Sequence, residues 1–199
     1  MANPLNALAG ADITPLARTR VPVRSSRPLL AIVGSSGSGK TTLIEALLPQ
    51  LAATRLRVAV VKHAHGGIQV DKPGKDTHRA ATAGAVQVVV GSARQWAVMG
   101  RIEHPGADPS LEWLIGRLDL TNVDLILAEG FHFERCPKIE VYRPVHGRPP
   151  LCTNDPDLIA IATDAPFDGP GIVDLNDTAA IAALVRARMT HFSTLAAAV

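Results

Sequence analysis

The segment that most constrains the fold of this chain covers residues 29–53. It opens with "LLAIV" (29–33), a short and fully apolar run that is typical of a buried strand. "GSSGSGKT" (34–41) follows and matches the pattern G-x-x-x-x-G-K-[ST] at every fixed position. "KTTLIEALLPQLAA" (40–53) then places leucines on one helical face, although Pro49 is expected to kink or shorten that helix. A strand, a glycine-rich loop and a helix in this order predict a phosphate-binding loop.

The chemistry of this loop gives most of its residues a role. Glycines let the backbone curl so that successive N–H groups point at phosphate oxygens, and the helix N-terminus adds partial positive charge. Lys40 is expected to reach the β- and γ-phosphates, Thr41 to ligate Mg²⁺, and Thr42 to contact an α-phosphate. The predicted nucleotide-binding residues of the loop are Gly34, Ser35, Ser36, Gly37, Ser38, Gly39, Lys40, Thr41 and Thr42. A flexible glycine–serine turn is the alternative interpretation, and the flanking strand and helix weigh against it.

The other apolar segments predict an α/β fold. Further strands are expected at residues 57–63, 85–91, 95–102, 123–130, 138–143 and 158–164, and further helices at 76–84, 108–118 and 177–189. Asp76, Asp108 and Asp177 are expected at or near the helix caps. The strand runs are continuous rather than alternating, which favours a mainly parallel sheet with helices on both faces. Residues 85–91 and 95–102 predict an antiparallel edge hairpin.

Composition and charge limit the domain count and the kinds of partner. The 199 residues suit one domain, expected at 29–199, after a flexible basic arm at 1–28. That arm holds four arginines and one aspartate, so its net charge is +3. Since the whole chain has a net charge of +2, residues 29–199 have a net charge of −1. A body this close to neutral does not suggest a nucleic-acid partner.

No stretch approaches the roughly 20 apolar residues of a membrane span, and no signal peptide is recognisable. Cys136 and Cys152 have no metal-type spacing and do not suggest a disulfide scaffold. We therefore expect a cytoplasmic protein with no membrane partner.

A second carboxylate is expected near the phosphate loop. "LILAEGF" places Glu129 at the end of an apolar strand, and ligands of open α/β sheets bind at the carboxyl ends of the strands. Glu129 could hold the metal's water or orient an attacking water, and the alternative is a surface or helix-capping carboxylate. Asp124 begins the same strand about 16 Å away. It is therefore expected at the wrong end of the sheet and receives no role.

The stretch "VVKHAHGGIQVDKPGKDTHR" (60–79) follows the second strand, whose tip should rise beside the phosphate loop. Lys62 and His65 are expected near the phosphates. His63 and His65 share a face of an extended chain, but a transition-metal site needs a third ligand, and His78 is too distant along the chain. A structural or hydrogen-bonding role for these histidines is therefore favoured.

The later half of that stretch contains mixed charges around a Pro73-Gly74 turn. Loops after the second strand of such folds often sense the γ-phosphate. Asp76 could ligate Mg²⁺-bound water, activate a water for hydrolysis, or only cap a helix. Lys75 could contact phosphate in the same chain or across a dimer.

Taken together, these stretches resemble the MobB family of molybdopterin-guanine dinucleotide biosynthesis accessory proteins. The matching segments are "GSSGSGKTTLIEALLPQL", "VKHAHGG", "DKPGKDTHRAATAGA", "RQWAVM", "DLILAEGFH", "PKIEVYR" and "IATDAP", in order over about residues 29–190. The chain departs from the family pattern at Gly66, where a further histidine is usual, and in its longer basic arm.

The resemblance implies a homodimeric GTP-binding protein of the P-loop class with weak Mg²⁺-dependent GTPase activity. It also implies work beside a MobA-type guanylyltransferase and contact with molybdopterin or a molybdoenzyme apoprotein. On this reading residues 34–42 bind the GTP phosphates and Lys40 acts in catalysis. Asp76 and Glu129 complete the metal and water site with Thr41.

Base recognition is where the residues say least. The guanine motif N-K-x-D does not occur, and "TNDPD" (153–157) is only a loose echo of it. Asp164 in "IATDAP" lies just past a late strand, where a carboxylate could pair with the guanine N1 and N2 hydrogens. A solvated turn residue is the alternative, so the choice of GTP rests mainly on the resemblance.

Two other functions stay open. One is a non-catalytic adaptor that carries nucleotide or pterin, and the other is a P-loop small-molecule kinase. The sequence reveals no arginine finger in cis, which favours slow turnover.

Overall fold

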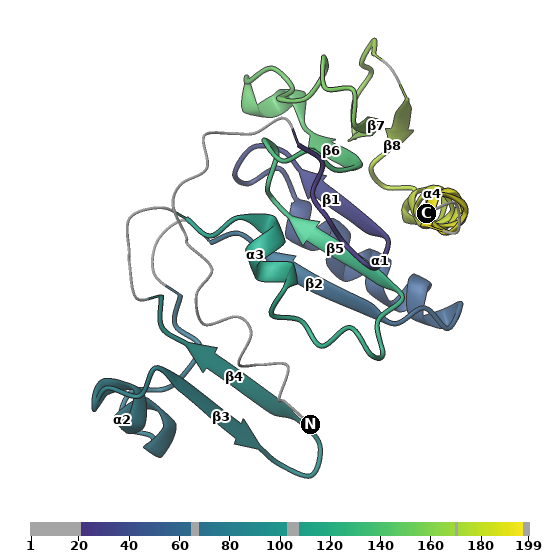
Figure 1. The fold of residues 1–199 in the computed structure, drawn as a ribbon. Coiled ribbons are helices and arrows are strands. Elements are labelled where there is room, and N and C mark those ends of the chain that lie inside the picture. Colours follow the sequence, from purple (N-terminus) through teal and green to yellow (C-terminus); the bar gives the residue numbers. More distant parts are fainter. Residues whose placement is uncertain (1–20, 65–67, 103–107, 170, 197–199) are drawn as a thin grey trace. The chain divides into compact units, whose positions relative to one another are not determined.

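The computed structural model describes residues 21–64, 68–102, 108–169 and 171–196. The chain divides into two compact units, which are described separately below. The larger unit combines residues 21–63 with those after 108, and the smaller unit contains described residues between 64 and 108 (Figure 1).

A six-stranded parallel sheet forms the centre of the larger unit, with the strand order β2-β5-β1-β6-β7-β8 (Figure 1). Its strands are β1 (Leu29–Val33), β2 (Val58–Lys62), β5 (Leu125–Glu129), β6 (Lys138–Tyr142), β7 (Leu158–Thr163) and β8 (Ile172–Asp174). The predicted parallel sheet is therefore confirmed. The sequence missed β8 because it has only three residues, of which two are exposed, and so lacks an apolar run.

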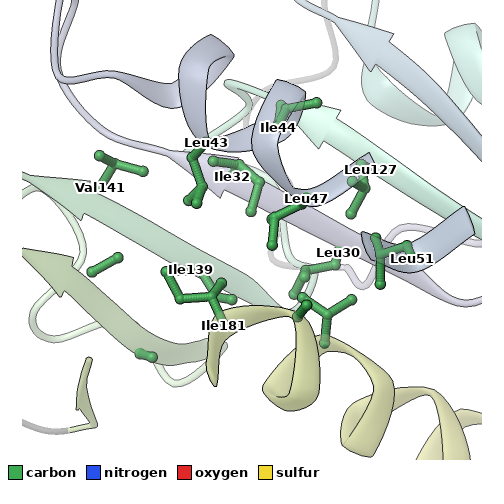
Figure 2. Close-up of a cluster of buried hydrophobic side chains, with 14 of the residues drawn as sticks. Leu30, Ile32, Leu43, Ile44, Leu47, Leu51, Leu127, Ile139, Val141 and Ile181 are labelled. Carbon is green, nitrogen blue, oxygen red and sulfur yellow. The ribbon is translucent and has the colours of Figure 1, made fainter. Parts of the chain in front are cut away.

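Helices cover both faces of this sheet, as predicted. Helices α1 (Lys40–Ala53) and α4 (Thr178–Ala196) pack on one face, where Leu30 and Ile32 of β1 point (Figure 2). Helix α3 (Leu111–Ile115) packs on the other face against the alternate β1 residues. Helix α1 runs through Pro49, so the expected shortening does not occur.

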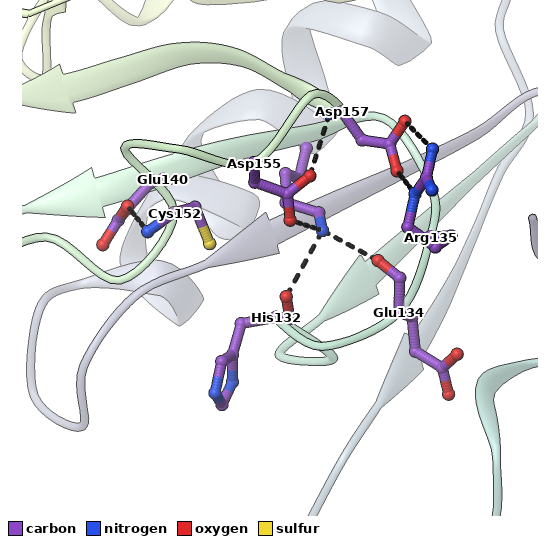
Figure 3. Close-up of polar contacts among 8 residues, drawn as sticks. His132, Glu134, Arg135, Glu140, Cys152, Asp155 and Asp157 are labelled. Carbon is purple, nitrogen blue, oxygen red and sulfur yellow. Dashed lines mark hydrogen bonds and ion pairs between the residues drawn. The ribbon is translucent and has the colours of Figure 1, made fainter. Parts of the chain in front are cut away.

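Strand β6 carries a buried lysine whose hydrogen bonds hold two neighbouring loops. Lys138 is fully buried, and its Nζ donates to the carbonyl oxygens of Glu134 at 2.7 Å and His132 at 3.3 Å. It also bonds the Asp155 carboxylate at 2.6 Å (Figure 3). An ammonium has three N–H donors, so each of them has a partner here.

Glu140, two residues further along β6, holds another loop with its negatively charged side chain. Its carboxylate accepts the backbone N–H groups of Leu151 at 2.6 Å and Cys152 at 2.9 Å. The single-turn 3-10 helix η2 (Pro144–His146) follows the strand.

The smaller unit contains helix α2 (Asp76–Thr82) and the strands β3 (Gln87–Gly91) and β4 (Trp96–Gly100). These strands pair antiparallel, as predicted, and form a two-stranded sheet of their own. Lys75 is the N-cap of α2, so the expectation that Asp76 caps this helix is wrong and Asp76 is its first helical residue.

The other two helix starts can be compared with their expected caps. At α3 the cap is Ser110, whose hydroxyl accepts from Trp113 N at 3.1 Å, and Asp108 lies two residues before it. Asp177 does cap the start of α4, where its carboxylate accepts from Ala180 N at 2.9 Å.

Residues 21–28, which the sequence assigned to the arm, are bonded to the larger unit. Val23 N donates to the carbonyl of Arg135 at 2.9 Å, and Arg27 donates to the carbonyl of Leu120 at 3.1 Å. Residues 1–20 of the expected arm lie outside the described part of the chain. Within the described part, no helix is both long and apolar enough to cross a membrane.

Candidate functional site

The loop between β1 and α1 turns so tightly against β6 that glycine is required in it. Gly34 has a φ of 136°, and a Cβ built on it would lie 2.3 Å from the carbonyl oxygen of Val141. Gly39, with a φ of 101°, is the N-cap of α1. Only glycine adopts such backbone angles without strain. The two fixed glycines of the motif are therefore explained by backbone geometry.

Lys40 folds back over this loop. Its Nζ donates to the carbonyl oxygens of Gly34 at 3.0 Å and Ser35 at 2.8 Å. Burial lowers the pKa of Lys40, the charge of Glu129 opposes that shift, and Lys62 adds to it. The ammonium therefore lies inside the curl of the loop, bonded to neutral carbonyls that an anionic oxygen can replace.

A buried hydroxyl group in the loop lacks a hydrogen-bond partner. Ser38 is almost completely buried, and within the described residues its Oγ has no hydrogen bond. Buried polar groups are nearly always paired, and an unpaired one is unfavourable. Ser38 therefore has a hydrogen bond to offer a bound group such as phosphate.

Thr41 and Glu129 meet at the carboxyl end of the sheet. Glu129 ends β5, which lies between β1 and β2. The Thr41 hydroxyl donates to Glu129 Oε1 at 2.6 Å. Lys62, at the end of β2, places its Nζ 3.0 Å from the same carboxylate oxygen and 3.3 Å from the Thr41 hydroxyl. Hydroxyl and carboxylate oxygens are the ligands that Mg²⁺ prefers, and an ammonium lies against both of them.

Sequence reasoning missed Arg143, which follows β6. Its Nε donates to the carbonyl oxygen of Ser38 at 3.0 Å, and its Nη1 pairs with the Asp164 carboxylate. Asp164 directly follows β7, so the strand order β1-β6-β7 places Arg143 between the phosphate loop and Asp164. The signal was the arginine that ends "KIEVYR", which marked only a strand end in the sequence.

The remaining predicted site residues are divided between the loop and the smaller unit. Ser36 and Gly37 are exposed at its tip, and Thr42 is exposed in the first turn of α1. Lys75 and Asp76 belong to the smaller unit. There the Asp76 side chain is fully exposed, 3.7 Å from an Arg79 nitrogen. Their roles in phosphate and metal binding stay predictions.

The histidines and Asp124 complete the sequence expectations. His63 N donates to the carbonyl oxygen of Glu129 at 3.1 Å, and its ring lies 5.4 Å from that of Phe131. His63 thus helps to shape the tip of β2, whereas His65 lies outside the described residues. Asp124 lies just before β5, at the far end of the sheet, where it bonds Arg57 at 2.8 Å. That position agrees with its exclusion from the site.

A parallel sheet with a glycine-rich phosphate loop between β1 and α1 defines a P-loop NTPase fold. The family model described as "Molybdopterin guanine dinucleotide synthesis protein B" (MobB) matches residues 29–164. The chain belongs to this family, and the resemblance recognised in its sequence is confirmed.

Curated relatives and solved structures agree with this assignment. A "Molybdopterin-guanine dinucleotide biosynthesis adapter protein" from Haemophilus influenzae is 42% identical over 166 residues, covering 83% of this chain and 91% of the relative. The protein of the same name from Escherichia coli is 41% identical over 161 residues, covering 79% and 91%. A crystal structure of molybdopterin-guanine biosynthesis protein B superposes with a TM-score of 0.61 at 30% identity, covering 80% of this chain and 98% of that one.

Proposed function

We propose that this protein binds GTP at residues 34–42 together with Mg²⁺ and acts as an accessory protein in molybdopterin-guanine dinucleotide biosynthesis. The observation that carries the nucleotide part is the arrangement of Lys40 over the loop carbonyls with the Thr41–Glu129 pair beside it. The biosynthetic part comes from the relatives, whose names state that role.

The phosphates would bind in the curl of the loop. Backbone N–H groups there and the start of α1 favour anions. Lys40 would exchange its bonds to the Gly34 and Ser35 carbonyls for bonds to the β- and γ-phosphates. A charged partner makes a stronger hydrogen bond than a neutral carbonyl does, so the exchange favours binding.

Thr41 and Glu129 would hold the metal ion, directly or through water. Mg²⁺ supplies charge neutralisation of the phosphate oxygens when it is bound. Glu129 is buried and hydrogen-bonded to Thr41, so the two oxygens are positioned before any ligand arrives. We propose Asp76 and Lys75 as a further metal- and phosphate-contacting element, because the Asp76 carboxylate is exposed.

Asp164 would read the base. Its carboxylate lies at the carboxyl end of β7, on the same edge of the sheet as the phosphate loop. A carboxylate there can accept the N1 and N2 hydrogens of guanine, which adenine does not offer. This supports GTP over ATP.

Slow hydrolysis and partner binding complete the proposal. Glu129 and Lys40 are the residues that we propose to act on the phosphates. A MobA-type guanylyltransferase is the proposed partner protein. The word "adapter" in the names of the relatives favours a second candidate, a carrier of nucleotide or pterin without turnover.

A homodimer is supported by the exposed hairpin of the smaller unit. Val89 and Val98 pair across β3 and β4, and Trp96 lies two residues before Val98 along β4, on the same face. All three side chains are about half exposed or more. Exposed apolar patches of this kind mark association sites.

Calorimetry on the parent and the Lys40→Ala variant tests the phosphate site. The variant should lose most of its affinity for GTP with Mg²⁺, at least tenfold, because a charged hydrogen-bond donor is removed. Equal affinities would mean that the loop does not bind the phosphates. Phosphate release, measured with and without the guanylyltransferase, separates a slow GTPase from a carrier, which binds GTP and releases nothing.

A further inference from the structure

Arg143 bonds two parts of the larger unit that are far apart in the sequence. Its guanidinium bonds the Ser38 carbonyl of the phosphate loop at 3.0 Å and also the Asp164 carboxylate. A Cβ built on Gly39 would lie 3.7 Å from two nitrogens of this guanidinium, so the group packs directly on the loop. The Arg143 and Asp164 side chains are only 34% and 25% exposed. The pair is therefore partly shielded from solvent.

The order of the strands separates the two ends of a bound nucleotide. Thr41 and Glu129, the proposed metal ligands, lie on the β5 side of β1, whereas Arg143 and Asp164 lie on the β6 and β7 side. Ligands of open α/β sheets lie across the carboxyl ends of the strands. A nucleotide with its phosphates in the loop and its metal at Thr41 therefore has its base on the side of Arg143.

We propose that Arg143 is a positioning residue for base specificity, which fixes the Asp164 carboxylate relative to the phosphate loop so that it accepts the guanine N1 and N2 hydrogens. This inference rests on the proposed function, in which Asp164 reads the base. A guanidinium is rigid and planar, so it fixes the orientation of a carboxylate that it pairs with. Arg143 bonds Asp164 Oδ2, and a carboxylate has about four acceptor sites in all. Acceptor capacity therefore remains for the base.

The opposite ends of the same two strands supply a matched control. Arg135 lies shortly before β6 and Asp157 directly before β7, and their side chains pair at 2.5 Å. These side chains are 33% and 22% exposed, almost as in the Arg143 pair. The chemistry and burial are therefore alike, but this pair lies at the edge of the sheet away from the phosphate loop.

The experiment measures the affinities for GTP and for inosine triphosphate, which lacks the guanine 2-amino group, by calorimetry with Mg²⁺. The parent should prefer GTP by about tenfold, because a carboxylate built to accept a hydrogen bond disfavours a ligand without the donor. Asp164→Ala and Arg143→Met should each bring this ratio close to one. Arg143→Lys, which keeps the charge without the planar fork, should give an intermediate ratio. Arg135→Met should keep the ratio of the parent.

The outcomes separate this inference from the function on which it rests. A parent that binds both nucleotides equally, or an unchanged ratio in Asp164→Ala, rejects the guanine part of the proposed function and the inference with it. A ratio that is lost in Asp164→Ala but kept in Arg143→Met overturns the inference alone, because Arg143 would then only brace the loop. Circular dichroism checks folding. If Arg143→Met does not fold, a parent-like ratio in Arg143→Lys overturns the inference.

Discussion

Two lysine–carboxylate pairs of the larger unit have similar N–O distances, but their lysines differ in burial. At the start of β6, Lys138 Nζ lies 2.6 Å from a carboxylate oxygen of Asp155. Beside the phosphate loop, Lys62 Nζ lies 3.0 Å from a carboxylate oxygen of Glu129. The Lys138 side chain is 0% exposed and has two further carbonyl partners (Figure 3), whereas the Lys62 side chain is 53% exposed. Distance alone therefore does not distinguish a structural ion pair from one at the proposed ligand site.

Burial and the number of partners make that distinction. A buried charge must keep its partners because water cannot replace them, so Lys138 holds its loops permanently. Lys62 can exchange Glu129 for water or another anion at small cost, because the lysine is half in solvent. Glu129 is itself buried but keeps its hydrogen bond to the Thr41 hydroxyl. The Lys138–Asp155 pair is therefore suited to stabilising the fold. The Lys62–Glu129 pair is suited to a site that binds and releases a ligand.

The largest effect is expected when the buried Lys138–Asp155 pair is broken. Lys138→Met should lower the free energy of unfolding by about 3–5 kcal/mol, because Asp155 and two loop carbonyls lose their partner. Urea unfolding measures this loss. Lys62→Met is the matched variant and should cost no more than about 1 kcal/mol. Equal losses in the two variants would contradict the distinction drawn between the two pairs.

The reactivity of the two cysteines shows whether water reaches the buried surroundings of Lys138. Burial raises the pKa of both Cys136 and Cys152 to about 12. Only the thiolate reacts, so labelling of the native protein at pH 8 should be about a thousandfold slower than for a free thiol. The pKa values are higher than in the unfolded chain. The thiols therefore stabilise the fold fully below about pH 8.5, and this contribution declines as the pH rises toward 12.

A disulfide-exchange reagent followed by absorbance measures the labelling rate, with the urea-unfolded protein as reference. Labelling of the native protein as fast as that of the unfolded protein would show that solvent enters these surroundings. The Lys138–Asp155 pair would then lack the shielding on which its expected effect depends.

The smallest effect concerns the Lys62–Glu129 pair. If Thr41 and Glu129 bind the metal ion, Lys62 competes for the same oxygens. Lys62→Met should therefore tighten Mn²⁺ binding to the nucleotide-free protein by about 1 kcal/mol, or roughly fivefold. Electron paramagnetic resonance of free Mn²⁺ measures the affinity, and Lys72→Met, an exposed lysine of the smaller unit, is the control. Unchanged or weaker Mn²⁺ binding in Lys62→Met would contradict the competition.

Some parts of the site follow from local sequence and others do not. The strand, glycine loop and helix of residues 29–53 form as predicted, because apolar periodicity and glycine geometry act over short distances. The end of an apolar strand also located Glu129 at the correct edge of the sheet. The burial of Lys138 and Glu140 was not predictable, because lysine and glutamate are almost never fully buried unless they are paired, and their partners are distant in the sequence.

The sequence by itself determined the family, the P-loop NTPase fold, and the strand, glycine-rich loop and helix of residues 29–53. Tertiary structure alone decided which ion pairs became structural and which remained exchangeable. It also decided that Arg143 bonds Ser38 across 105 residues of chain, next to Asp164. The reason is physical: a motif acts through backbone geometry that neighbouring residues determine. The surroundings of a charged side chain depend instead on strands that pair only when the whole sheet has formed.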